Sequence, residues 1–501
     1  MSEFSKVSED TAGRNSLYLF ASYAFSQALG FIFWILVSQI SNSNVLGDAS
    51  AATTLSASII GITALGIPTG SKRLVGISLG ENDLSSVRVI LKKSLLLVFV
   101  STLVVSFSLV LMVYYFPILL NLSFPLILIS SITAIFAVVV SLLKGVFVAS
   151  LRTGSVLVTE TIGTTFKILL GTVFLIYGLE AIGATLGHLV GFISMFILFM
   201  VLSRRLFSKE DTTQSDISNH DIVEASLPSW IPNILAVLGT QLGIIVVIGF
   251  NGSLESGLYF VAFSLFSFIA MVPKAIATVA FPVMSGMKSG KEFATEKIMK
   301  MSIIIAMPLS LVLFKHPTLL LILFGSDFLN ANLMLQILLI GIAPISISQG
   351  IIAYVYAQGR YRMVLVLGIL ENIPRTILYF LLVPLIGGIG ASLSYLIGSL
   401  ILLFGSIFSS SKANLKINWD VILLIIVIPF SLFILFYFIS LPLLIDITLF
   451  LAICFIVYSR LKLLTRYDLT VFIQIILPKK YVTIFLERFK PIIDVLFGNS
   501  D

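Results

Sequence analysis

The chain has 501 residues, of which 58% are hydrophobic and 11% are charged, and its formal net charge at pH 7 is +7. A soluble domain keeps about a quarter of its residues charged, so this composition excludes a soluble fold and predicts an all-α polytopic membrane protein. The only cysteine, Cys454, excludes disulfides within the chain.

Apolar segments long enough to cross a membrane follow one another along nearly the whole chain. A helix needs about 20 apolar residues to span the hydrocarbon core, and this length predicts fourteen spans. The first apolar run is long and follows a polar start, which is typical of an uncleaved span and not of a signal peptide. The predicted spans are 16–40, 49–70, 94–116, 125–148, 157–178, 182–203, 226–250, 257–281, 299–323, 333–357, 363–384, 387–408, 419–440 and 443–459.

The distribution of Lys and Arg predicts the orientation of these spans. With the N-terminus in the cytoplasm, 27 of the 31 Lys and Arg residues fall in cytoplasmic segments or, as Lys144 and Lys300 do, within the cytoplasmic end of a span, and none falls in an outer loop. Cytoplasmic loops carry this excess of basic residues, so we expect both termini on the cytoplasmic side of the plasma membrane. The net charge is therefore a topology signal, and nucleic acid is not an expected partner. The remaining four, Lys167, Lys274, Lys315 and Arg375, lie inside predicted spans.

Two polar stretches divide the chain. The link at 204–225 separates six spans from eight, and the tail after Ser459 places Phe485, Phe489, Ile492 and Leu496 at helical spacing beside basic residues. Such a tail is typical of an amphipathic helix on the inner membrane surface. We therefore predict an N-terminal six-helix lobe at 1–203, a cytoplasmic linker at 204–225, a C-terminal six-helix lobe at 226–408, two additional transmembrane helices at 409–459 and a cytoplasmic amphipathic tail at 460–501.

An internal repeat relates spans five and six to spans eleven and twelve. IGATLGHLVG at 182–191 returns as IGASLSYLIG at 389–398, and at an offset of 208 Arg152 meets Arg360 and Lys167 meets Arg375. A shift of six spans is even, so both copies face the same way across the membrane. Transporters built from such parallel repeats place their substrate site between the halves. The last two spans lie outside the repeat.

Several stretches, in order, resemble the multidrug/oligosaccharidyl-lipid/polysaccharide (MOP) exporter superfamily and, within it, the Wzx-type polysaccharide-export flippases. They include LGIPTGSKRLVGISLGENDLSSVR (65–88), SLPSWIPNILAVLG (226–239), AIATVAFPVMS (275–285) and LFGSDFLNANLMLQILLIG (323–341). The resemblance implies two six-helix lobes around a V-shaped cavity that carries lipid-linked sugars across the bilayer. Where the family often has an acidic residue in span seven, this chain has Gly243, so a role for that carboxylate does not transfer.

Charges in the middle of a span are costly and usually serve a function. Lys167 and Arg375 lie at nearly the same depth, and we expect each to face the cavity from its own half and to contact the phosphate of a substrate. The alternative is snorkelling or a private ion pair. Glu371 precedes Arg375 by four residues, and Glu160 precedes Lys167 by seven, so we predict both as charge partners or coupling residues.

The other cations are predicted to act nearer the ends of the spans. Lys274 lies in the inner part of span eight and is a further candidate for substrate binding, whereas Lys315 near the outer end of span nine is expected to snorkel. Arg73, Arg152 and Arg360 lie at cytoplasmic span ends. They either set the topology alone or also surround the inner mouth, where a pyrophosphate head group would arrive.

These features favour a flippase that moves lipid-linked, pyrophosphate-linked oligosaccharide or polysaccharide units from the cytoplasmic to the outer leaflet by alternating access. The alternative is a MATE-like multidrug cation antiporter, which needs buried carboxylates. A membrane glycosyltransferase or polymerase is disfavoured, because the chain has three histidines and no Asp-x-Asp, so we predict no enzyme activity, cofactor or metal site. Glycan-assembly enzymes are compatible partners, and the sequence leaves open whether a proton or a sodium ion is coupled.

Overall fold

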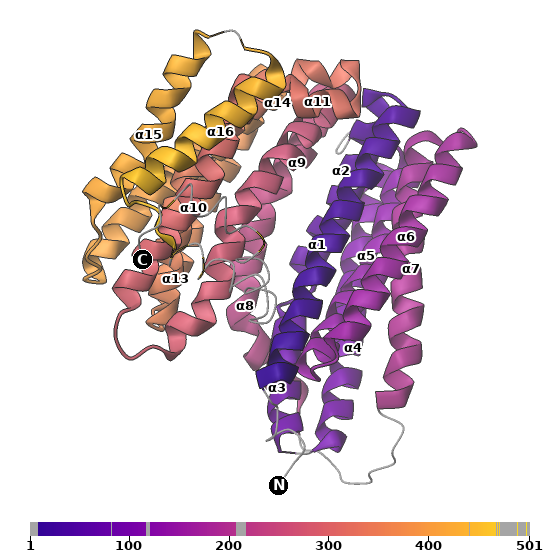
Figure 1. Cartoon of the computed structure of the whole chain (residues 1–501). Coiled ribbons are helices and arrows are strands. Elements are labelled where there is room, and N and C mark those ends of the chain that lie inside the picture. Colours follow the sequence, from indigo (N-terminus) through magenta and orange to yellow (C-terminus); the bar gives the residue numbers. More distant parts are fainter. Residues whose placement is uncertain are drawn as a thin grey trace. The chain divides into compact units, whose positions relative to one another are not determined.

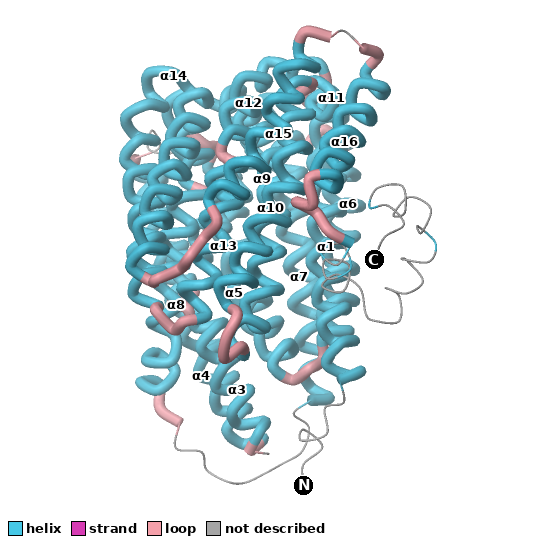
Figure 2. The backbone as a smooth tube through the Cα atoms, turned by 60° about the vertical axis from the view of Figure 1, so that its left-hand side comes forward, coloured by secondary structure: helices cyan, strands magenta, loops and turns pink. Residues whose placement is uncertain are grey.

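The computed structural model describes residues 9–81, 83–116, 121–206, 217–439 and 441–466, together with the single residues 468, 470, 488 and 497. The described chain is helical nearly throughout, with short loops, and it contains no strand (Figure 2). This confirms the prediction of an all-α protein. Residues 207–216 of the predicted linker and, apart from Arg488, the predicted surface helix at 485–496 lie outside the described residues.

The described helices follow the predicted order. In the N-terminal part they are α1 (Glu9–Ile40), α2 (Ser43–Thr63), α3 (Ile67–Gly80), α4 (Leu84–Tyr115), α5 (Phe124–Ala149), α6 (Thr153–Ile176), α7 (Glu180–Leu206), α8 (Asn219–Thr240) and α9 (Leu242–Gly286). They continue with α10 (Lys291–Lys315), α11 (Thr318–Leu321), η3 (Ile322–Phe324), η4 (Ser326–Ala331), α12 (Asn332–Ile340), α13 (Ile342–Ala357), α14 (Tyr361–Lys412), α15 (Trp419–Tyr437) and α16 (Leu443–Arg460).

Twelve helical segments of the described chain are long and apolar enough to cross a membrane. Two of them are far longer than one span, because Asn219–Thr278 has 60 residues and Tyr361–Lys412 has 52. The first is interrupted at Gly252, whose φ is +82°, and the second at Ile386 and Gly387. Counting two spans in each of these two segments gives fourteen, in agreement with the prediction from the sequence.

The chain folds into two compact units whose boundaries fall inside long helices. One unit comprises Met1–Phe260 and Tyr379–Gly388, and the other comprises Val261–Leu378 and Ile389–Asp501. The chain therefore passes from one unit to the other within α9 and again within α14. The lobes predicted from the repeat are defined differently, and their boundaries stay a prediction.

In the first unit, α5 forms the centre. It packs against α2, α3, α4 and α7, while α6 packs against α1 and α7 (Figure 1). The core includes Val138, Leu142 and Phe147 of α5 and Phe199 of α7, which are all buried. By contrast, α4 exposes a row of large apolar side chains that includes Phe107, as expected of a helix that faces lipid.

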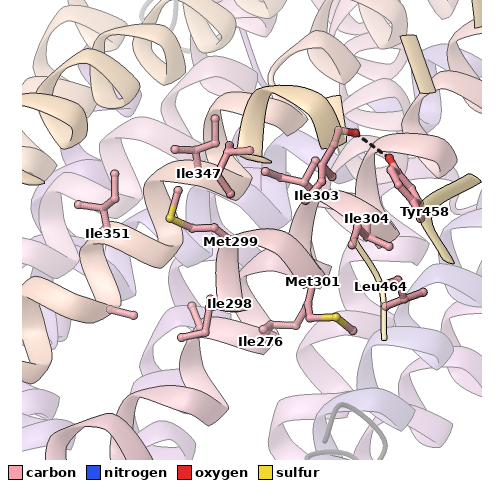
Figure 3. Packing of buried hydrophobic residues seen from close by; sticks show 14 of the residues in the cluster. Ile276, Ile298, Met299, Met301, Ile303, Ile304, Ile347, Ile351, Tyr458 and Leu464 are labelled. Carbon is pink, nitrogen blue, oxygen red and sulfur yellow. Dashed lines mark hydrogen bonds between the residues drawn. The ribbon is translucent and has the colours of Figure 1, made fainter. Parts of the chain in front are cut away.

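In the second unit, α10 forms the centre and packs against α12, α13, α15 and α16. Figure 3 shows its core, in which Met299 and Ile303 of α10 lie beside Ile347 and Ile351 of α13. The Tyr458 hydroxyl of α16 donates to the Ile425 carbonyl of α15 at 2.8 Å, which satisfies a polar group inside this apolar core. The two additional helices are thus an integral part of this unit.

The predicted span at 49–70 is broken. α2 ends at Thr63, the backbone takes positive φ values at Leu65 (+51°) and Gly66 (+71°), and α3 starts with Pro68 in its first turn. A break inside a membrane frees backbone carbonyls that need donors. Here Trp230 Nε1 donates to the Ile62 carbonyl at 2.9 Å and Ser101 Oγ donates to the Thr63 carbonyl at 2.7 Å.

The ninth span lies earlier than predicted. α10 covers Lys291–Lys315 in place of 299–323, because His316 and Pro317 end the helix and the short helices α11, η3 and η4 follow. The window of apolar residues continued through Phe324, and hydropathy alone could not detect the stop. Lys315 is therefore the last residue of the span.

The repeat is visible in the backbone geometry of two turns. Between α5 and α6, the Arg152 amide donates to the Phe147 carbonyl at 2.9 Å, and between α13 and α14 the Arg360 amide donates to the Val355 carbonyl at 3.1 Å. The donor and the acceptor of the second pair each lie 208 residues after those of the first, which is the offset found in the sequence. The residue before each arginine is left-handed in both turns, with φ +55° at Leu151 and +72° at Gly359.

Candidate substrate-binding site

The helices that carry the two mid-span cations are packed in the same register. A Cβ atom placed on Gly191 would lie 2.9 Å from the Cβ of Lys167, and one placed on Gly398 would lie 2.9 Å from the Cβ of Arg375. Small residues allow membrane helices to approach this closely. Each cation therefore leaves its helix opposite a glycine of the following span, as the repeat predicts.

Lys167 projects from α6 onto aromatic rings of α1. Its Nζ lies 4.4 Å from the centre of the Phe33 ring and 5.6 Å from that of Trp34, which is cation–π geometry. Lys167 is partly buried, and in the part of the chain that the structure describes no carboxylate is paired with it. His188 of α7 lies in the same region, with its Nδ1 buried and without a hydrogen-bond partner. The result is a half-buried cation whose charge is balanced by ring faces alone.

Arg375 is the opposite case. Its side chain is 1% exposed and forms an ion pair with Glu371, with 2.7 Å between Nη2 and Oε1. Ser399 Oγ lies 3.2 Å from Nη2, and the guanidinium carbon lies 3.9 Å from the centre of the Tyr395 ring. The private ion pair considered from the sequence is therefore present. Glu371 is the charge partner that was predicted.

Glu160 does not pair with Lys167. It is buried on α6 and forms an ion pair with Lys144 of α5, and it also accepts a hydrogen bond from the Ser22 hydroxyl of α1. Lys144 Nζ in turn lies 4.4 Å from the centre of the Tyr23 ring. Glu160 thus ties three helices together, and the sequence could not show this because Lys144 lies on another helix.

The remaining predicted cations are exposed at the surface of their units. Lys274 lies on α9, Arg73 on α3 and Arg152 at the start of α6. Arg360 at the start of α14 donates from Nη1 to the Lys412 carbonyl at 3.1 Å. None of these four forms an ion pair with a residue that the structure describes.

Lys315 is not a simple snorkelling anchor. Its Nζ contacts both carboxylate oxygens of Asp446 at 2.8 Å and the Phe436 carbonyl at 2.7 Å. His316 Nε2 lies 2.6 Å from the same carboxylate, which is almost fully buried. This cluster joins α10 to α15 and α16. Sequence reasoning missed Asp446, although a single acid in the otherwise apolar span 443–459 is a signal for a buried partner.

Gly243 has little room for a side chain. An added Cβ atom would lie 3.0 Å from the Tyr259 hydroxyl and 3.0 Å from Cζ of Tyr379. The Tyr379 hydroxyl donates to the Gly239 carbonyl at 3.0 Å, so this ring is held in place. Two tyrosines fill the space that a carboxylate would occupy.

The aromatic partners of both cations were not identified as binding residues from the sequence. Phe33 and Trp34 carry no spacing signal that points to Lys167, and Tyr395, which stands at the position of His188 in the repeated stretch, carries none that points to Arg375. In the described ranges, no group of three His, Cys, Asp or Glu side chains is placed to hold a metal ion. The arrangement suits the binding of an anion at Lys167.

Comparison with known proteins places the chain in a family. The model of the polysaccharide biosynthesis protein family matches residues 12–288, more than half of the chain. No curated protein sequence matches.

Solved structures give the fold. A lipid II flippase, MurJ, in an inward closed conformation is similar with a TM-score of 0.70 and 16% identity, covering 88% of this chain and 98% of that one. An inward-facing multidrug resistance MATE transporter of the MOP superfamily has a TM-score of 0.62 and 15% identity, with 79% and 98% covered. A MOP superfamily transporter from Pyrococcus furiosus, described as having a binding pocket of reverse polarity, has a TM-score of 0.55 and 17% identity, with 80% and 94% covered.

At these identities the structural matches establish the fold, while the family match covers the first half of the chain and extends past the predicted linker. Together with the fourteen spans, they agree with the resemblance found in the sequence. The chain therefore belongs to the polysaccharide biosynthesis protein family, and it is a multi-pass membrane protein whose fold is shared by the MurJ flippase and the MATE transporters.

Proposed function

We infer that the protein is a flippase for an anionic, lipid-linked oligosaccharide or polysaccharide unit, and that Lys167 binds the phosphate group of this substrate. It carries the unit from the cytoplasmic to the outer leaflet by exposing the binding site to each side in turn, with both termini in the cytoplasm. It acts as a transporter and not as an enzyme.

The observation that carries this proposal is the environment of Lys167, a cation inside a span that contacts two aromatic rings and is paired with no carboxylate of the described residues. The residue lies about 21 Å from the start of α6, well inside the membrane. A charge at that depth costs at least about 2.5 kcal/mol, and such residues usually pair or serve a transport pathway. The rings of Phe33 and Trp34 offset part of that cost. A diphosphate linker would provide the missing anion, and lysine is a common partner of phosphate oxygens.

The other predicted residues support this assignment in different ways. Arg375 already forms an ion pair with Glu371, so we assign it to the stability of α14 and not to direct contact with the substrate. Glu160 holds α1, α5 and α6 together through Lys144. The exposed cations Arg73, Arg152, Arg360 and Lys274 are proposed to attract the anionic head group at the cytoplasmic side.

A MATE-like cation antiporter remains the alternative, since such transporters share the fold. It would need a buried carboxylate that is available to a cation. The buried carboxylates of the described chain are Glu160 and Asp446, and each forms an ion pair with a lysine. Gly243 leaves no acid in span seven. These facts favour an anionic substrate over an organic cation.

The test is translocation of a lipid-linked oligosaccharide diphosphate in vesicles that contain purified protein. Lys167→Met keeps the length of the side chain and removes the charge, and it should lower the rate at least about tenfold, the cost of one charged hydrogen bond. Lys167→Arg should keep part of the activity. Lys92→Met, which removes an exposed charge from α4, is the matched control and should transport normally.

Full activity of Lys167→Met would refute a role for Lys167 in binding. Efficient export of organic cations by the unmodified protein, without translocation of the oligosaccharide lipid, would instead establish the antiporter.

A further inference from the structure

A separate apolar cavity lies in the first unit between α2, α4, α8 and α9. Its volume is about 210 Å³, and its walls include Leu55, Ser58 and Ile62 of α2, Val105 of α4, Val237 of α8 and Ile245 of α9. Lys167 and its aromatic partners are not among the lining residues. The cavity is therefore distinct from the candidate site for the anion.

Two glycines of α2 lie in close contact with neighbouring helices. A Cβ atom on Gly61 of α2 would lie 2.2 Å from a methyl carbon of Val237 on α8, and one on Gly47 of α2 would lie 1.8 Å from the Ser253 carbonyl oxygen on α9. These contacts are fourteen residues apart on α2, about 21 Å. The part of α2 that lines the cavity, from Leu55 to Ile62, begins between these two contacts and ends beside Gly61.

The walls offer almost no polar group. The only polar side chain that lines the cavity is Ser58, and its hydroxyl donates to the Thr54 carbonyl at 2.9 Å within α2. Apolar cavities of this size exclude water and accept apolar guests. The walls therefore favour an apolar guest over water or a sugar.

The depth of the cavity along α2 indicates that it lies at the level of the hydrocarbon core of the bilayer. Leu55 lies about 18 Å from the start of α2, inside the roughly 30 Å of hydrocarbon that a span crosses. Ile62 in the wall is 42% exposed, and on α4 the neighbour of Val105, Val104, is 57% exposed. The cavity thus borders surfaces that face the acyl chains of the bilayer.

We propose that this cavity binds an acyl chain of a bilayer phospholipid. The chain supplies the contacts that the separated helices lack, and it lies between α2 and the helices α8 and α9, which belong to different predicted halves of the repeat. An occupant at this place sets how closely these helices approach each other. The cavity is then a lipid site that modulates transport, whatever solute the protein carries.

The experiment uses the full protein in phospholipid vesicles that contain a phospholipid with a photoreactive diazirine in the middle of one acyl chain. After illumination, mass spectrometry should find the label on the peptides that contain Leu55 and Ile59, which line the cavity and are buried from the surface. Val105→Trp fills the cavity and should abolish this labelling. Val104→Trp places the same ring on the adjacent lipid-facing position and should leave it unchanged.

A second variant, Ser58→Leu, fills the cavity from α2 and decides the matter if Val105→Trp fails to fold, as judged by size-exclusion chromatography. Labelling that persists at these peptides in the folded filling variants would overturn the proposal, because surface lipid alone would then explain it. A photoreactive polyprenyl phosphate that labels the same peptides when the phospholipid probe does not would also overturn it and would assign the cavity to the substrate tail.

Discussion

Lys167 and Arg375 occupy equivalent positions of the repeat but have different surroundings. Both lie about 21 Å from the start of their helices, and both are packed against a glycine of the next span. Arg375 has a carboxylate partner, a hydroxyl and a ring, whereas Lys167 has rings only. Equivalent positions in the repeat therefore place the two Cα atoms at the same depth and against the same kind of neighbour. The other residues around each side chain decide whether its charge is paired.

The largest effect that we expect concerns Arg375. In Arg375→Ala the Glu371 carboxylate loses its partner, and removal of one member of a buried ion pair costs about 3–5 kcal/mol, here nearer the lower figure because Glu371 is partly exposed. Thermal unfolding in detergent should show a clear loss of stability. Lys167→Met, which removes a charge that lacks a carboxylate, should be as stable as the unmodified protein. An Arg375→Ala protein that keeps its stability and loses transport would place Arg375 in the binding site instead.

Asp446 tests whether the contrast between paired and unpaired cations extends to a third residue. Asp446→Asn removes the carboxylate that Lys315 and His316 both contact, and we expect a loss of about 2 kcal/mol, since both of these side chains remain partly exposed. The loss should appear as earlier proteolysis between α15 and α16 as well as a lower unfolding temperature. Thr448→Ala, an exposed change on the same helix, serves as the control. Unchanged protection from protease would mean that the cluster does not hold these helices.

Substitutions at Gly191 and Gly398 test whether the two copies of the repeat also pack their helices in the same way. Gly191→Ala and Gly398→Ala should each destabilise the protein by about 1–3 kcal/mol, because the added methyl group meets a backbone carbonyl, Gly163 at 3.0 Å and Glu371 at 2.9 Å. Gly76→Ala has open space around it and should cost little. If only one of the two variants loses stability, the equivalence of the two helix pairs is limited to the backbone.

The smallest effect concerns the two equivalent turns. Leu151 has a φ of +55°, which costs a non-glycine residue about 1 kcal/mol, whereas Gly359 adopts +72° without strain. Leu151→Gly should therefore raise the unfolding temperature slightly and Gly359→Leu should lower it. Opposite shifts of similar size, measured in one detergent, would confirm that the turns are equivalent. A loss of stability in Leu151→Gly would mean that the Leu151 side chain contributes more by packing than its backbone costs.

The sequence by itself determined the number of spans, the repeat and the register of the two cations. These follow from hydropathy over about 20 residues and from identities at a constant offset, and both are local properties of the chain. Hydropathy did not reveal the break between α2 and α3, because apolar residues continue through Leu65 while the backbone changes direction at Leu65 and Gly66.

The partners of charges on different helices were decided by the tertiary structure alone. Glu371 could be assigned to Arg375 because four residues on one helix bring side chains together. Glu160 could not be assigned to Lys144, nor Asp446 to Lys315, because these partners lie on different helices and meet only when the helices pack. The same holds for the rings beneath Lys167 and for the apolar cavity, since a span that is apolar on all sides carries no mark of which face meets another helix and which meets lipid.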